Sequence, residues 1–320
     1  MRFVVIGAGA LGSIVAAHLA RAGTPVALVA RGRRAEHIEA QGVGLVGLAE
    51  FRQSLPVIRP GAKDIAADVV IQCVKTYDSA QALESLSFAG RPVALSLQNG
   101  VLKNEELASK FGPDGVLGAA ASVAGELLAD GTVRFTMNER LPLGEPAGGL
   151  SPRAREIAGA LAGAGIAAEA VDNIRDVEWT KYAAFLPMMA AGILTRQETW
   201  RNLSDPGVSL AIVRMMREVV ALARASGADV EDKGGFPVAR IAAASPEEGA
   251  ALVREFGALL EARAPQHRVS ALQDLLRGGR LEVDAILGHA VRLGQRLGVA
   301  VPAIETSHQL ASVLAGNPKE

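Results

Sequence analysis

The first dozen residues constrain the fold more than any other part of the chain. A short apolar run ends in Gly-x-Gly-x-x-Gly, and a segment of helical composition follows directly. Spaced glycines alone are weak evidence, but between a strand and a helix they indicate a dinucleotide-binding turn. The alternative is a turn that binds nothing. The residues predicted to bind the cofactor at this turn are Gly7, Ala8, Gly9, Ala10, Leu11 and Gly12.

Each glycine of this motif has a different physical task. Gly7 permits the tight turn, Gly9 lets the backbone approach a pyrophosphate, and Gly12 lets the helix pack against the strand. The start of the helix then offers unpaired N–H groups and a partial positive charge to the phosphates. The sequence therefore predicts a phosphate-binding loop at the N-terminus.

The end of the second predicted strand indicates which dinucleotide is bound. About 20 residues after the glycines, an NAD enzyme usually has an acidic residue that binds the ribose 2′-OH. This chain has Arg31 instead. A guanidinium can bind a 2′-phosphate through two parallel hydrogen bonds, so the sequence predicts NADPH/NADP+ over NADH. A solvated turn is the alternative for Arg31 and the favoured interpretation of Arg33 and Arg34.

Composition excludes several classes of function. The net charge is −1 and no basic stripe is interleaved with aromatic residues, which argues against nucleic-acid binding. A single cysteine, Cys73, excludes disulfides and cysteine-based metal sites. The five histidines lack ligand spacing, so no metal is predicted.

The longest apolar run covers residues 183–194, which is too short to span a bilayer and indicates a buried helix. This helix could line an active site, form a dimer contact or lie in the core, so a homodimer is left open. The chain enters its first strand directly, without a signal-peptide pattern, and a cytoplasmic location is expected.

The order of predicted elements gives an α/β fold in two parts. Strand-like and helix-like segments alternate in the first half, which predicts an N-terminal Rossmann-type, doubly wound and largely parallel sheet. We expect an NADP-binding domain at residues 1–170 and an all-α C-terminal substrate and catalytic domain at 171–320. In the first, strands are expected at residues 68–74, 92–97, 116–122 and 166–171, with a hairpin turning at 129–131 whose partner is 140–143. In the second, helices are expected at residues 173–196, 206–226, 246–263, 282–298 and 302–314.

Two polar residues follow predicted parallel strands. Lys75 comes after the strand at 68–74, and Asn99 comes after the strand at 92–97. In a Rossmann enzyme, the carboxyl ends of the strands border the cleft between the domains, where substrate usually binds. Taken singly, Lys75 could be an ordinary exposed lysine and Asn99 ordinary turn chemistry.

The helical half contains further candidates. Lys181 stands at the edge of an apolar segment, where partial desolvation suits a lysine to proton transfer, although many such lysines only extend to solvent. Ser270 and Asp274 are four residues apart and share a face if that stretch is helical. Glu282 opens the next predicted helix and could be no more than a partner for its dipole.

These pieces together resemble the ketopantoate reductase (2-dehydropantoate 2-reductase) family along nearly the whole chain. The matching features are the glycine motif, Arg31, Cys-Val-Lys-Thr at 73–76, Gln-Asn-Gly at 98–100, Trp-x-Lys at 179–181, Ser270, Asp274, Glu-Val-Asp at 282–284 and Gly-Val-Ala-Val-Pro at 298–302.

The resemblance implies NADPH-dependent reduction of a small-molecule 2-keto acid to a D-2-hydroxy acid, most simply 2-dehydropantoate to pantoate. It implies that Lys181 is the general acid and that Glu282 lies beside the nicotinamide ribose and this lysine. Asn99 and Lys75 would line the cofactor and substrate cleft. Ser270 would contact the substrate carboxylate, with Asp274 supporting it.

One departure from the family pattern bears on the substrate. Well-known members have substrate-contacting asparagines four and eight residues after the catalytic lysine, whereas this chain has Phe185 and Met189. A site that lacks such donors loses preference for a hydroxylated substrate, which favours a keto acid with an apolar side chain, as in mandelate-type dehydrogenases. The alternative is that polar contacts come from elsewhere. Two further alternatives are a non-catalytic NADPH-binding sensor and a methyltransferase, which would be expected to have an acidic residue in place of Arg31.

Overall fold

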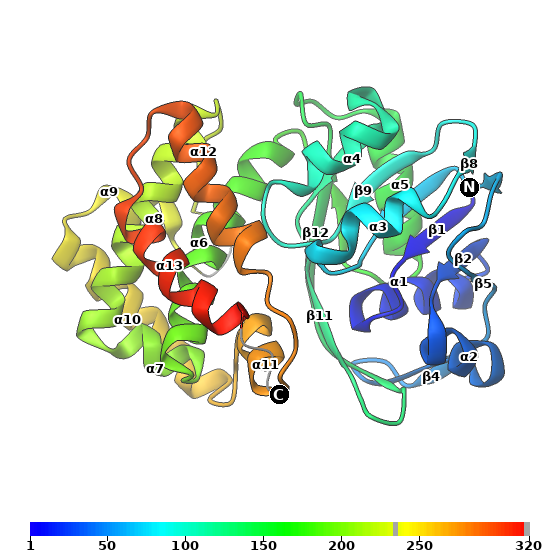
Figure 1. The fold of residues 1–320 in the computed structure, drawn as a ribbon, viewed down its shortest axis with the longest axis horizontal. Coiled ribbons are helices and arrows are strands. Elements are labelled where there is room, and N and C mark those ends of the chain that lie inside the picture. The colour runs from blue at the N-terminus through cyan, green and yellow to red at the C-terminus, as the bar shows by residue number, and fades with distance from the viewer. Residues whose placement is uncertain (233–235, 317–320) are drawn as a thin grey trace. The chain divides into compact units, whose positions relative to one another are not determined.

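The computed structural model describes residues 1–232 and 236–316, which form two compact units. The first unit comprises Met1–Gln98 and Leu102–Arg175, and the second comprises Asn99–Val101 and Asp176–Glu320. Figure 1 shows strands and helices intermixed in the first half of the chain and helices in the second. The sequence did not predict that residues 99–101 would group with the second unit.

Eleven strands of the described residues form one mixed, largely parallel sheet in the first unit (Figure 1). The order along its main path is β4-β3-β12-β10-β9-β7-β1-β2-β5, and β11 and β13 pair with β12. A separate parallel pair joins β6 (Ile65–Ala66) and β8 (Phe88–Ala89). The strands of the large sheet are β1 (Phe3–Ile6), β2 (Val26–Val29), β3 (Val43–Gly47), β4 (Phe51–Gln53), β5 (Val57–Ile58), β7 (Val69–Gln72), β9 (Val93–Ser96), β10 (Val116–Ala119), β11 (Ser122–Leu127), β12 (Val133–Gly144) and β13 (Ala168–Ala170).

Helices cover both faces of this sheet, which confirms the predicted doubly wound arrangement. Phe3 and Val5 of β1 pack in one core with helices α1 (Ala10–Arg21) and α5 (Pro152–Gly163). Val4 and Ile6 pack in another core with α3 (Ser79–Glu84) and α4 (Lys103–Phe111). Alternate residues of a strand point to opposite faces, so a strand buried on both sides must be apolar throughout. The remaining helices of this unit are α2 (Gly32–Gln41) and the short 3-10 turns η1 (Thr76–Asp78) and η2 (Pro113–Gly115).

Two strand predictions in this unit were wrong in their bounds. The strand expected at 116–122 ends at Ala119, and β11 begins at Ser122. Residues 140–143 are not a separate partner for the hairpin, because β12 runs unbroken from Val133 to Gly144. This long strand changes partners along its length, pairing with β3 near its start and with β13 near its end. The polar middle of β12, residues 137–140, pairs with β11.

The described residues of the second unit are helical, as predicted, and contain no strand. Two short helices, α7 and α9, were not expected, and the single helix predicted at 282–298 begins with a π-helical turn. The elements are α6 (Ile174–Thr195), α7 (Thr199–Ser204), α8 (Pro206–Ala225), α9 (Val238–Ala243), α10 (Pro246–Arg263), α11 (Ser270–Leu276), the π-helix η3 (Asp284–Gly288), α12 (His289–Leu297) and α13 (Pro302–Gly316).

Local chemistry explains where the long helices of this unit begin. Asp205 accepts hydrogen bonds from the N–H groups of Gly207 and Val208 at the start of α8. Ser245 and Glu248 form a reciprocal capping box at the start of α10. Both caps are followed by a proline, whose missing N–H costs nothing in the first turn of a helix.

The apolar run at 183–194 lies in the core of the second unit. Ala183, Leu186, Met189, Ala190 and Ile193 belong to its main cluster of buried side chains, and α6 continues through Pro187. Of the three roles left open for this run, packing in the core is the one observed. No helix among residues 1–232 and 236–316 has the length and hydropathy needed to cross a membrane.

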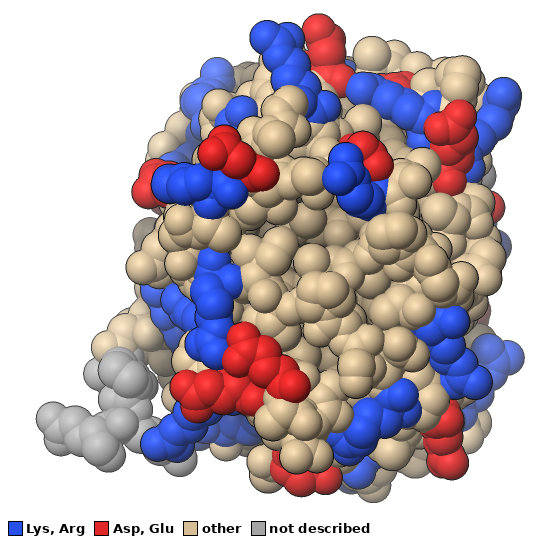
Figure 2. Space-filling model, turned by 90° about the vertical axis from the view of Figure 1, so that its right-hand side faces the viewer, with Lys and Arg blue, Asp and Glu red and all other residues tan. Residues whose placement is uncertain are grey.

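Charges of both signs are interspersed on the face drawn in Figure 2, which is the right-hand side of Figure 1. Lysine and arginine side chains lie next to aspartate and glutamate side chains around an uncharged centre. This face therefore has no surface of a single sign that would attract a polyanion.

Candidate functional site

The turn after β1 has the geometry that each glycine was predicted to provide. Gly7 has a φ of +110°, and a Cβ atom there would lie 2.8 Å from the Val74 backbone nitrogen. A Cβ atom on Gly12 would lie 2.0 Å from the Gly7 carbonyl oxygen. A Cβ atom on Gly9, in contrast, would meet no atom within 4 Å. Two of the glycines thus allow close packing within the protein, and the third leaves open space above the backbone.

This turn fits the pyrophosphate of a dinucleotide. Gly9 is the N-cap of α1, its side-chain position is open, and the first turn of the helix contains no acidic residue. A helix N-terminus of this kind presents N–H groups and a positive dipole end to an anion. Residues 7–12 would hold the phosphates, and the bound nicotinamide would supply the hydride for a reduction.

Arg31 lies at the N-cap of α2, directly after β2, and its side chain is largely exposed. Its guanidinium forms an ion pair with Asp78, 2.9 Å between Nη2 and Oδ2, and a longer contact of 3.4 Å to the Gln81 side chain. The sequence did not predict this pairing, because Asp78 follows a different strand. Arg31 therefore has an anionic partner already within the protein.

Arg34 corrects a prediction made from the sequence. It does not lie on a solvated turn, because its guanidinium is half-buried and donates to the Ala8 carbonyl, the Ser13 hydroxyl and the Gly131 carbonyl, at 3.0, 3.0 and 2.6 Å. Burial lowers the pKa of Arg34 from its usual value. Through these three hydrogen bonds, the Arg34 guanidinium stabilises the glycine turn. Arg33 is exposed, as expected for a turn residue.

Lys75 follows β7 and is the N-cap of η1, half-buried. Strands β2 and β7 both pair in parallel with β1, one on each side. The sheet thus brings Arg31 and Lys75 to the two flanks of the glycine turn at the carboxyl ends of these strands. Cys73 stands just before Lys75, and burial raises the pKa of its thiol, which argues against a nucleophilic role.

The segment that carries Asn99 is anchored at its start by buried polar side chains. Gln98 donates to the Val74 carbonyl and to the Ser79 hydroxyl, both at 2.7 Å. The ammonium of Lys103, which is 4% exposed, donates to the Gln98 and Ala119 carbonyls. A lysine buried to this extent must be well satisfied by hydrogen bonds, so its role is to fix this loop. Sequence inspection missed it because Lys103 looks like a helix surface residue.

In the second unit, three of the candidates are connected through Ile286. A Cβ atom on Gly100, next to Asn99, would lie 2.9 Å from Ile286 Cδ1. The Tyr182 hydroxyl, next to Lys181, donates to the Ile286 carbonyl at 2.6 Å. The Ile286 N–H in turn donates to the Glu282 carbonyl at 3.1 Å. The backbones that carry Asn99, Lys181 and Glu282 therefore meet at the π-helix η3, an irregularity often found at functional sites.

Lys181 and Glu282 are both half-buried. Lys181 lies in α6 between the buried Thr180 and Tyr182, and burial raises the pKa of the Tyr182 phenol, so this neighbour stays neutral. Glu282 precedes the first turn of the helix that begins with η3. Its position at a helix start is therefore as predicted.

Ser270 and Asp274 lie in α11, so the four-residue spacing does put them on one face of a helix. Ser270 is exposed and Asp274 is half-buried. A Cβ atom on Gly192 of α6 would lie 2.6 Å from Val269 Cγ2, so α11 begins packed against α6. Helix α6, which carries Lys181, thus packs against the start of the helix that carries Ser270.

Phe185 and Met189, which follow Lys181 at helical spacing, occupy different environments. Met189 is 1% exposed and belongs to the core of the second unit. Phe185 is half-buried and packs against the same core. Of the two apolar replacements, Phe185 is therefore the one with surface left to meet a ligand.

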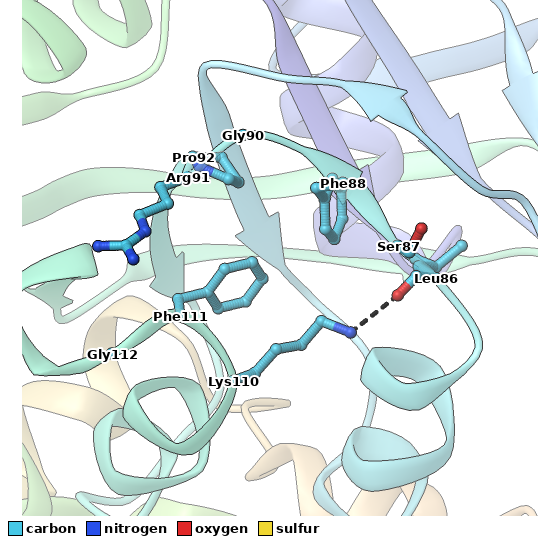
Figure 3. A pocket seen from close by; sticks show the side chains of 9 residues that line it. All are labelled: Leu86, Ser87, Phe88, Gly90, Arg91, Pro92, Lys110, Phe111 and Gly112. Atoms are coloured by element: carbon cyan, nitrogen blue, oxygen red, sulfur yellow. Dashed lines mark hydrogen bonds between the residues drawn. The ribbon is translucent and has the colours of Figure 1, made fainter.

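A cavity of about 530 Å³ lies elsewhere on the first unit. Figure 3 shows Phe88, Arg91 and Phe111 around it, with the Lys110 ammonium donating to the Leu86 carbonyl at 2.8 Å. This cavity borders the amino end of β9, whereas Rossmann-type sheets bind ligands at their carboxyl ends. Among residues 1–232 and 236–316, no three His, Cys, Asp or Glu side chains gather as they would around a metal ion.

Family models match most of the chain. Residues 3–148 match ketopantoate reductase PanE/ApbA, and residues 173–315 match the C-terminal part of the same family. A 2-dehydropantoate 2-reductase of Archaeoglobus fulgidus is 32% identical, over 93% of this chain and 92% of that protein. One from Mesorhizobium japonicum is 29% identical, over 98% of each.

Solved structures show the same relationship. A PanE/ApbA family ketopantoate reductase from Ralstonia eutropha superimposes with a TM-score of 0.80 at 29% identity, covering 99% of both chains. A D-mandelate dehydrogenase solved with NADH and anilino(oxo)acetate gives a TM-score of 0.83 over 99% of both chains, but at 18% identity this likeness concerns the fold. On the sequence matches and the fold together, the chain belongs to the ketopantoate reductase PanE/ApbA family.

Proposed function

We propose that this chain is an NADP-dependent oxidoreductase that reduces 2-dehydropantoate to pantoate, a 2-keto acid to a D-2-hydroxy acid. The proposal rests on one observation in a chain of this family: Gly9 is the N-cap of α1, and the space next to it is open. The names of the Archaeoglobus and Mesorhizobium relatives support the choice of substrate. In this proposal the first unit binds the cofactor through residues 7–12, Arg31 and Lys75, and the second unit carries the proton donor.

The protein's own residues have separate tasks in the proposed reaction. When bound, the reduced nicotinamide supplies a hydride to the keto carbon. The Lys181 ammonium stabilises the negative charge that develops on the keto oxygen and then donates its proton to it. Glu282 orients Lys181, and Asn99 lines the site for both cofactor and substrate. Ser270 donates to the substrate carboxylate, and Asp274 supports Ser270.

A second candidate is a reductase of the same type for a 2-keto acid with an apolar side chain. It is supported by Phe185, whose half-buried ring follows Lys181 by one turn of α6 and cannot donate a hydrogen bond. The substrate would then resemble phenylglyoxylate more than 2-dehydropantoate.

A panel of keto acids distinguishes these candidates. NADPH oxidation is followed with 2-dehydropantoate, phenylglyoxylate and branched aliphatic 2-keto acids at matched concentrations. The main proposal expects the highest kcat/KM with 2-dehydropantoate, and the second candidate expects it with phenylglyoxylate. Binding of NADPH without turnover of any member of the panel would favour a non-catalytic sensor. A homodimer and a cytoplasmic location remain predictions, and sedimentation velocity tests the first.

A further inference from the structure

The ion pair between Arg31 and Asp78 stands at the carboxyl end of β1. Arg31 follows β2, and Asp78 is the last residue of η1, after β7. Strands β2 and β7 flank β1 in the sheet. The pair therefore joins two segments on opposite sides of the strand that leads into the glycine turn. In a Rossmann-type site the adenosine ribose lies beside the end of the second strand, so a bound dinucleotide has to meet this pair.

Arg31, at the end of β2, is more available for a 2′-phosphate than Arg34. The donors of Arg34 are bonded to the protein oxygens of Ala8, Ser13 and Gly131. The Arg31 side chain is 64% exposed, and the shorter of its two polar contacts is the 2.9 Å ion pair with Asp78. The carboxylate that competes for this guanidinium is 29% exposed and comes from the neighbouring segment.

NADPH and NADH interact differently with the Asp78 carboxylate. A 2′-phosphate that approaches Arg31 is repelled by Asp78, which already neutralises the guanidinium. A ribose 2′-OH can instead donate a hydrogen bond to a carboxylate, which is how NAD-binding sites of this type usually select their cofactor. Asp78 thus has the chemistry of a NAD-selecting acid, although it does not follow β2, where that acid is usually found.

We propose that Asp78 is a cofactor-selecting residue that offsets Arg31, so that the chain binds both NADPH and NADH with a reduced preference for NADPH. This inference rests on the proposed dinucleotide-binding function. Because the pair is exposed to solvent, its effect is modest. Exposed ion pairs contribute up to about 1 kcal/mol, which corresponds to at most about a five-fold change in affinity.

The test measures binding rather than turnover. Dissociation constants for NADPH and NADH are measured on the full chain by the change in nicotinamide fluorescence. For Asp78→Asn, the Kd of NADPH falls about two- to five-fold while that of NADH stays constant or rises. The change in the ratio of the two constants diminishes at high salt, because the groups involved are exposed.

A matched ion pair elsewhere in the first unit serves as the control. Arg134 and Glu126 are 3.1 Å apart with side-chain exposures of 53% and 31%, close to those of Arg31 and Asp78. This pair joins β11 and β12 and has no part in the proposed site. Glu126→Gln therefore removes a comparable surface pair, and the ratio of the two dissociation constants stays unchanged.

A second variant makes the result independent of how Asp78→Asn folds. Arg31→Ala weakens NADPH about ten-fold or more and leaves NADH within about two-fold, since a charge-assisted pair to phosphate is lost. When Asp78→Asn is added to Arg31→Ala, the Kd of NADPH falls by a smaller factor than when Asp78→Asn is made alone. The two effects are not additive, because the two side chains interact directly.

Two results would overturn the proposal. One is an unchanged ratio of dissociation constants in Asp78→Asn. The other is a weaker binding of NADPH in that variant, which would mean that Asp78 orients Arg31 toward the phosphate. Failure of the unmodified chain to bind either dinucleotide would refute the proposed function itself and is distinguishable from both.

Discussion

The two units present their candidate functional groups by different physical means. In the first unit, the proposed phosphate-binding element is backbone, a glycine turn and the N–H groups at the start of α1. In the second unit, the candidates are side chains, Lys181 and Glu282, on backbones that meet at Ile286. The first kind depends on a short stretch of chain. The second depends on helices brought together from residues a hundred positions apart.

This difference has a practical consequence. A backbone site tolerates changes in neighbouring side chains but not the loss of a glycine. A site made of side chains tolerates changes at neighbouring positions but not the loss of one ammonium group. Variants in the two units should therefore fail in different measurements, which gives four ways to test the contrast.

The largest effect is expected for Lys181→Ala. Loss of the proton donor lowers kcat by about 10²–10⁴-fold. The Kd of NADPH stays within about two-fold, because the proposed cofactor contacts come from residues other than Lys181. Steady-state kinetics and fluorescence titration measure the two quantities separately. Arg214→Ala, which removes an exposed cation from α8, serves as the control and leaves both unchanged. If Lys181→Ala keeps the kcat of the unmodified chain, or if it also loses NADPH binding, the proposed difference between the two units is wrong.

Two glycine variants separate binding from folding within the first unit. Gly9→Ala is expected to weaken NADPH at least about ten-fold, because its methyl group takes the space that the pyrophosphate needs. Its Tm stays within about 2 °C, since φ at Gly9 is −70° and the new Cβ meets no protein atom within 4 Å. Gly12→Ala lowers the free energy of unfolding by about 1–3 kcal/mol, because its Cβ would lie 2.0 Å from the Gly7 carbonyl oxygen. Thermal unfolding with and without NADPH checks both. Equal NADPH affinity in Gly9→Ala and the unmodified chain would contradict the proposed binding of the pyrophosphate at this turn.

The second unit should lose stability in mild acid. His289 is 2% exposed, and burial, with Arg296 and Arg292 adding to it, lowers its pKa from 6.5 to about 4. The folded state favours the neutral ring, so this stabilisation is complete above pH 6.5 and is lost as the pH falls toward 4. The loss amounts to at most about 3 kcal/mol. Asp284, whose pKa is lowered by Arg292, keeps its stabilising contribution throughout this window and loses it only as the pH falls below its ordinary value of 3.8.

Urea unfolding of the second unit at pH 7.5, 6 and 5 measures this dependence. His289→Gln should make it less steep, because an amide does not titrate, while His267, whose pKa is also lowered by burial, still does. An equally steep dependence in that variant would assign the acid sensitivity to other groups.

The smallest effect is expected for Tyr182→Phe. The change removes the 2.6 Å hydrogen bond to the Ile286 carbonyl, which keeps a backbone N–H partner at the end of η3, so the cost is about 1 kcal/mol. We expect kcat to fall a few-fold with the Kd of NADPH unchanged, because Lys181 is the next residue. Thr306→Val, which removes an exposed hydroxyl that donates to Pro302, is the control and has little effect on either quantity. A loss of stability without any change in kcat would limit Tyr182 to a role in packing.

Much of the fold followed from sequence patterns that act over short distances. Helix α10 has the predicted bounds, because its capping box and its apolar spacing are local. The short helices α7 and α9 were missed, since helices of six residues are not stable alone and depend on packing. The π-helical start of the predicted helix at 282–298 also has no local signal. Its irregular turn coincides with the hydrogen bond from Tyr182, a contact made a hundred residues away.

The sequence by itself determined the glycine turn, the alternation of strands and helices, and the chemical types of Lys181, Glu282 and Arg31. Only the tertiary structure decided what Arg31 and Arg34 contact. Two arginines three positions apart have different partners, because β7 brings Asp78 to one and the glycine turn brings Ala8 and Ser13 to the other. Local patterns follow from the geometry of one segment, whereas the partner of a long charged side chain depends on which distant segments the sheet makes neighbours.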